Sequence, residues 1–142
     1  FIHLTDMIFS GVFEEFPTLR FAFLEAGSSW VPFMLDRLDY EFDSVFGARA
    51  RPRLKRRPSD ILRNHEGFWV SCEMGEACLK YTIDTMGADR IVYASDFPHE
   101  PTEEDLTSDL PNFLADTQYT EDVKRKIARD NAKRLYRIDG QN

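Results

Sequence analysis

Apolar residues recur along the chain with two spacings that alternate from segment to segment. Leu4, Ile8, Val12 and Phe16 follow one another at every fourth position, which predicts a helix over residues 1–15 that ends before Pro17. Residues 19–24 form a nearly continuous apolar run, typical of a strand buried on both faces of a parallel sheet. A helix over residues 30–42 should follow, with Ser29 as its N-cap.

The alternation continues to the C-terminus. We predict strands over residues 68–72 and 91–94, and helices over 59–62 (capped by Ser59), 75–87, 106–114 and from Thr120 onward, with residues after Gly140 frayed. Single strands alternating with helices are typical of parallel βαβ units, so we predict an α/β fold of about three parallel strands with flanking helices. Three strands cannot close a barrel, and two of them would be unpaired edges. We therefore expect preceding sequence, absent before Phe1, to complete the sheet.

Composition excludes several classes of protein. No apolar run approaches the roughly 20 residues that span a bilayer, so no membrane partner is expected. The net charge is −7 although six cations cluster at Arg49, Arg51, Arg53, Lys55, Arg56 and Arg57. The acidic remainder would repel nucleic acid, which makes a nucleic-acid role for this cluster the weaker alternative to a solvated loop. Cys72 and Cys78 fit neither a disulfide framework nor a zinc motif, so a reducing cytoplasm is expected.

Two carboxylates follow predicted strands. Asp96 ends the run that begins at Arg90, and carboxyl ends of parallel strands are where catalytic groups gather in α/β proteins. A hard carboxylate there suits a divalent metal, whereas the plain structural alternative is a cap on the following turn. Glu25 also follows a strand and, if desolvated, would serve as a general acid or base. Its structural alternative is bonding to the amides of residues 27–29.

Other candidates carry weaker signals. His99 lies three residues after Asp96 and would line the same pocket as a substrate contact, although a loop histidine is more often solvated. Trp30 is a second candidate substrate contact, with a core position on its helix as the alternative. Glu73 also follows a strand but belongs to no motif. His3 and His65 are expected to have no catalytic role.

Three segments together carry a recognisable signature: residues 16–27 followed by Trp30-Val31-Pro32, residues 90–99, and residues 130–136. They resemble, in that order, the sixth strand with its following loop, the eighth strand and the closing helix of the amidohydrolase-2 family. This family contains metal-dependent hydrolases and aminocarboxymuconate semialdehyde decarboxylase-like enzymes. The resemblance runs over nearly the whole chain but covers under half of a family member. It implies that residues 1–142 are the C-terminal part of one (β/α)₈ TIM-barrel domain.

The resemblance also implies a site. Family members hold one divalent metal, here expected to be Zn or Mn, and Asp96 matches the ligand on the eighth strand. The remaining ligands would lie upstream of residue 1. Many members place a proton-transferring histidine at the end of the sixth strand, where this chain has Glu25.

The resulting hypothesis is that this chain is part of a metal-dependent enzyme. That enzyme would hydrolyse or non-oxidatively decarboxylate a small carboxylated or cyclic substrate. The chain alone should be inactive, with the missing N-terminal half of the barrel as its partner, and we expect a homo-oligomer. The alternative is a non-catalytic αβ interaction domain that pairs through its edge strands.

Overall fold

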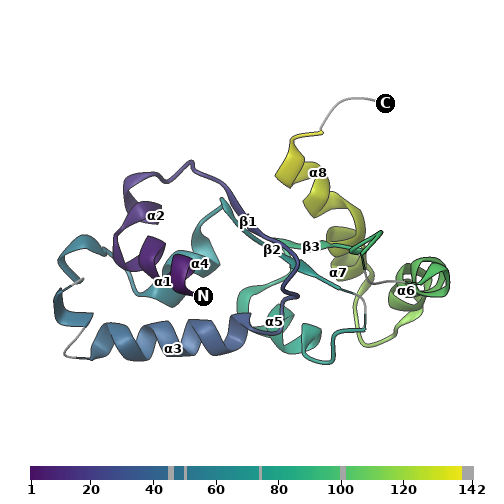
Figure 1. Cartoon of the computed structure of the whole chain (residues 1–142), viewed down its shortest axis with the longest axis horizontal. Coiled ribbons are helices and arrows are strands. Elements are labelled where there is room, and N and C mark those ends of the chain that lie inside the picture. The colour runs from purple at the N-terminus through teal and green to yellow at the C-terminus, as the bar shows by residue number, and fades with distance from the viewer. Residues whose placement is uncertain (45–46, 50, 74, 100–101, 139–142) are drawn as a thin grey trace. The chain divides into compact units, whose positions relative to one another are not determined.

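The computed structural model describes residues 1–44, 47–49, 51–73, 75–99 and 102–138, and Figure 1 shows their helices and strands. The predicted fraying after Gly140 lies outside these residues. The chain divides into two compact units. The first comprises Phe1–Phe21 and Trp30–Phe68, and the second comprises Ala22–Ser29 and Trp69–Asn142.

The first unit is helical around an aromatic core. It contains α1 (Ile2–Phe9), α2 (Val12–Glu15), α3 (Val31–Asp43), α4 (Pro58–Asn64) and two 3₁₀ turns, Gly47–Arg49 and Arg51–Arg53. The single helix predicted over residues 1–15 is broken, because Gly11 takes a left-handed φ of 83° between α1 and α2. Phe13 is buried and meets the rings of Phe21, His65 and Phe68 edge-on. This aromatic cluster accounts for part of the chain's high phenylalanine content.

Acidic side chains of the first unit pair with the basic segment. Arg56 bonds to Glu14, and Arg57 bonds to both Asp39 and Asp43. Burial raises the pKa of Asp39, but hydrogen bonds from Ser59 and Arg57 outweigh it and hold that pKa below its ordinary value. The N-cap assigned to Ser59 was wrong: Arg57 occupies that position, and the Ser59 hydroxyl donates to Asp39 at 2.7 Å. These ion pairs favour the structural alternative for the basic segment.

The second unit is organised around a three-stranded sheet. Its strands are β1 (Phe21–Phe23), β2 (Phe68–Cys72) and β3 (Ile91–Tyr93), in the order β1-β2-β3. β2 and β3 run parallel with Val70 opposite Ile91 and Cys72 opposite Tyr93. Every residue of β2 is buried, as expected for a central strand covered on both faces. β2 has its predicted bounds, whereas β1 and β3 are shorter than predicted.

The helices of the second unit are α5 (Leu79–Met86), α6 (Glu103–Ala115), α7 (Glu121–Arg125) and α8 (Asn131–Tyr136), with a π-helical turn at Lys126–Asp130. The π-helical turn and α8 pack against β3, and Ile127 is fully buried there. Thr120 caps α7 through its hydroxyl, and Gly87 ends α5 at a φ of 80°, both as predicted. The helix expected from residue 75 begins later, at Leu79.

The prediction that Ser29 caps α3 was wrong. Trp30 holds the N-cap position without a side-chain hydrogen bond, and the Ser29 hydroxyl donates to Glu76 at 3.0 Å. None of the described helices is both long enough and apolar enough to cross a membrane.

Candidate metal centre

Two carboxylates of the second unit stand just beyond strand ends in a strained backbone conformation. Glu25 follows β1 with a φ of 60°, and Asp96 follows β3 with a φ of 55°. For residues with a Cβ, this left-handed conformation costs about 1–2 kcal/mol. Such strain persists where surrounding structure fixes it, and it gathers at binding and catalytic sites.

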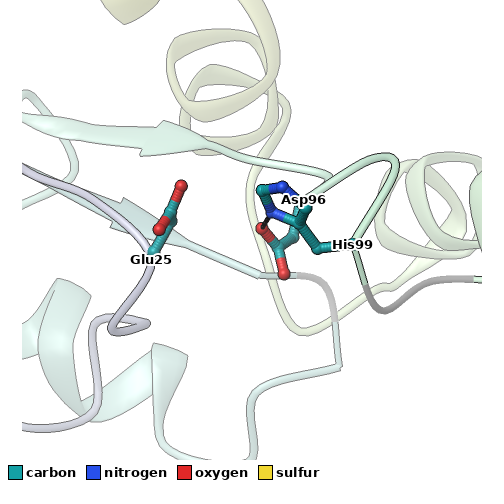
Figure 2. A group of neighbouring side chains, drawn as sticks. All are labelled: Glu25, Asp96 and His99. Carbon is teal, nitrogen blue, oxygen red and sulfur yellow. Dashed lines mark ion pairs between the residues drawn. The ribbon is translucent and has the colours of Figure 1, made fainter.

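The same two residues converge with His99. The ligand atoms of Glu25, Asp96 and His99 all lie within 4.8 Å of one another. Figure 2 shows these three side chains gathered beside the ends of the strands. The His99 Nδ1 lies 3.4 Å from an Asp96 carboxylate oxygen, and the His99 amide donates to the Asp96 carbonyl at 2.8 Å. This backbone bond closes the turn that carries both side chains.

The donor set fits a divalent metal. Two carboxylates and one imidazole suit Zn²⁺ or Mn²⁺, and ligands sharing such an ion at about 2.1 Å lie about 3–4 Å apart. Small side-chain rotations would bring donors within 4.8 Å to that spacing. The Asp96 side chain is 22% exposed and His99 is 69% exposed, so solvent and ions reach the group. The three donors lie close together, whereas the roles assigned to them from the sequence stay predictions.

The surroundings of Glu25 differ from the prediction. Glu25 is exposed, so the desolvation expected to tune it as an acid or base is absent in this chain. Glu25 lies in the loop that follows β1, where the sequence placed it. The structural alternative also changes, because the Ser28 amide donates to Glu76.

The remaining candidates are spread over the chain. Trp30 belongs to the first unit, where its ring meets Phe1 at 5.6 Å, and its role as a substrate contact stays a prediction. His65 is buried, and its Nδ1 accepts a bond from the Gly67 amide, a structural use. His3 is exposed. The amide of Glu73 donates to Glu76 at 2.8 Å.

Sequence reasoning missed Glu76. Its carboxylate accepts hydrogen bonds from Ser28, Ser29 and Glu73, and no motif marks it. The partner serines lie 47–48 residues away in sequence, so local patterns carry no sign of the contact.

The fold and the site together define an α/β protein with three candidate metal donors beyond the ends of its strands. A family model described as amidohydrolase matches residues 1–138. The chain therefore belongs to the amidohydrolase family, which confirms the resemblance seen in its motifs.

Relatives and solved structures place the chain within a larger fold. It is 32% identical to gamma-resorcylate decarboxylase of Rhizobium sp. (strain MTP-10005), over 98% of this chain and 40% of that protein. A crystal structure of 5-carboxyvanillate decarboxylase from Sphingomonas paucimobilis matches with a TM-score of 0.73 and 29% identity, over 96% of this chain and 39% of that chain. Dihydroxybenzoic acid decarboxylase from Polaromonas sp. JS666, with bound manganese, shares the fold at a TM-score of 0.70 and 21% identity, over 99% of this chain and 40% of that chain.

The chain spans about two-fifths of the length of these proteins. The neighbours confirm the predicted fold class, α/β with parallel strands as part of a (β/α)₈ barrel.

Proposed function

We propose that this chain is part of a metal-dependent enzyme that acts on a small carboxylated aromatic or cyclic substrate, by non-oxidative decarboxylation or hydrolysis. The observation that carries the proposal is the convergence of Glu25, Asp96 and His99 beyond the strand ends. The decarboxylases among the relatives favour decarboxylation over hydrolysis.

Each residue of the group has an assigned role. Asp96 would hold the metal, whose positive charge, when bound, would attract the substrate's carboxylate and hydroxyl oxygens. His99, on the same turn, would contact the substrate or share the ion. Loss of CO₂ breaks a carbon–carbon bond and leaves a carbon that needs a proton, and Glu25 is the residue assigned to carry it.

Calorimetric titration of the chain with Mn²⁺ and Zn²⁺ tests the metal site. Asp96→Asn should weaken binding at least about tenfold, because it removes an anionic donor. The matched control is Asp84→Asn, which changes an exposed carboxylate on α5 that pairs with Lys80. Binding that is equally strong in Asp96→Asn would refute the assignment, whereas binding that is absent from the unaltered chain would mean that ligands outside this chain are required.

Turnover belongs to the whole protein. We infer that further strands complete the barrel, that the assembly is a cytoplasmic homo-oligomer, and that further metal ligands lie outside this chain. Release of CO₂ from dihydroxybenzoates, followed with the chain alone and with a protein that includes the rest of the barrel, measures this. Turnover by the chain alone, abolished in Asp96→Asn, would contradict the need for a completed barrel.

A non-catalytic interaction domain is the second candidate. It is favoured by one observation, the position of β1 and β3 as the outer strands of the sheet. Outer strands offer backbone donors and acceptors to another chain. A stable self-associated species that forms equally well with and without metal would support this candidate.

A further inference from the structure

The loop that carries Glu25 is tied to the loop after β2 through a single carboxylate. Glu76 accepts bonds from the Ser28 amide at 2.9 Å and from the Ser28 and Ser29 hydroxyls at 2.8 and 3.0 Å. Its other oxygen accepts a bond from the Glu73 amide at 2.8 Å. One side chain therefore crosslinks the two segments that follow neighbouring strands.

Two further contacts keep this crosslink close. Ser28 is fully buried, and its carbonyl accepts a bond from the Thr82 hydroxyl at 3.0 Å. Gly27 has a φ of 57°, and a Cβ at that position would lie 2.7 Å from a Glu76 carboxylate oxygen. The backbone of residues 27–29 thus lies so close to the carboxylate that a Cβ at residue 27 would require the carboxylate to shift.

We propose that Glu76 is a positioning residue whose carboxylate holds the loop after β1 so that Glu25 stays beside Asp96 and His99. Glu25 lies two residues before Gly27, in a left-handed conformation that its own side chain does not stabilise by any hydrogen bond among the described residues. Anionic acceptors bind amides and hydroxyls more strongly than neutral ones do. The hydrogen bonds to the Glu76 carboxylate therefore restrain the conformation of the loop that carries Glu25, although Glu76 lies outside that loop. The proposal rests on the proposed function for the role of Glu25, and the loop geometry can be measured separately.

Glu76→Gln tests the charge and bonding pattern with little change in size. The matched control is Asp109→Asn, because Asp109 lines the same 300 Å³ cavity as Glu76 but takes no part in the bonds above. Amide hydrogen exchange by NMR reports on Ser28 and Glu73, whose amides donate to Glu76. The nuclear Overhauser effect between the Glu25 side chain and the His99 ring reports on the proximity of these two residues.

In Glu76→Gln, exchange at the Ser28 and Glu73 amides should accelerate at least about tenfold, since each loses a charge-assisted bond. Exchange within α5 should stay unchanged, the Glu25–His99 effect should be lost, and Mn²⁺ should bind at least about fivefold more weakly. Asp109→Asn should leave all of these readouts unaltered.

Three results would overturn the proposal. The first is unchanged exchange at the two amides, and the second is faster exchange throughout the second unit, which indicates a general structural role. The third is a Glu25–His99 effect that persists despite faster exchange. Absence of Mn²⁺ binding by the unaltered chain would concern the metal site alone, because exchange and the Overhauser effect test the positioning role without metal.

Discussion

Replacing Asn131 with alanine should destabilise the second unit. Asn131 is fully buried, and its Nδ2 donates to the carbonyls of Ala88 at 2.6 Å and Ile91 at 2.7 Å. Ala88 precedes β3 and Ile91 opens it, so this side chain ties the start of α8 to the strand that leads to Asp96. The bond also gives a physical reason for the asparagine in the closing-helix motif.

The magnitude follows from the two hydrogen bonds. Each contributes about 0.5–1.5 kcal/mol net, and buried acceptors left without their donor add a desolvation cost, for a total of about 2–4 kcal/mol. For a chain of 142 residues, about 3 kcal/mol corresponds to a fall in Tm of about 10 °C. Asn131→Asp should cost more, because it places carboxylate oxygens against two carbonyl oxygens.

Urea unfolding followed by the fluorescence of Trp69 measures this effect. Trp69 lies in the second unit and Trp30 in the first, so a Trp30→Phe background leaves one reporter for the second unit. The matched control is Thr107→Ala on α6 of the same unit, since the exposed Thr107 also donates from its side chain to a backbone carbonyl, at 3.0 Å. That control should cost less than about 1 kcal/mol. A loss in Asn131→Ala no larger than in the control would refute the reasoning.

Three other expectations concern strain, thiol reactivity and acid stability. Gly27→Ala should lower the free energy of unfolding by about 2–4 kcal/mol in thermal unfolding, and Gly75→Ala by about 1–2 kcal/mol. Both glycines have a positive φ, but only at Gly27 would the added Cβ meet a neighbouring atom. Equal losses in the two variants would contradict this contact. Burial raises the pKa of Cys72 while Cys78 is exposed, so a thiol reagent at mildly alkaline pH should label Cys78 alone until the chain unfolds. The lowered pKa of Asp39 stabilises the fold above the carboxylate's unfolded pKa, and this contribution is lost as pH falls below about 4. Asp39→Asn should therefore flatten the acid limb of the stability curve, and an unchanged limb would count against it.

Much of the fold could be predicted because the spacing of apolar residues and the length of an apolar run are local properties of the sequence. β2 has its predicted bounds, the last helical segment begins at Thr120, and Gly87 ends α5, all as expected. The break at Gly11 was not predicted, because the helical spacing of apolar residues continues across it while the φ angle of Gly11 becomes left-handed. Ser29 failed as a cap because a distant carboxylate competes for its hydroxyl.

The site shows the same division. Catalytic groups gather at the carboxyl ends of parallel strands, which is why Glu25 and Asp96 became candidates from sequence alone, whereas their proximity comes from the structure. The exposure of Glu25 could not be predicted, because the local sequence does not show which distant segments cover the loop after β1. His99 was placed near Asp96 by its spacing, and the turn bond between them explains why three residues suffice.

The order of the strands explains why the residue missed by sequence lies after β2. In the order β1-β2-β3, the outer strands lead to Glu25 and Asp96, and the central strand leads to Glu76. From the central strand, the Glu76 carboxylate accepts hydrogen bonds from the loop that follows β1. The central position thus suits a residue that fixes the geometry of its neighbours. It follows that substitutions after β2 should act on metal binding only through the loop of Glu25, whereas Asp96→Asn acts on it directly. The double variant of Glu76→Gln with Glu25→Gln tests this: the effect of Glu76→Gln on Mn²⁺ affinity should vanish once Glu25 is neutral, and a persisting effect would show that Glu76 acts by another route.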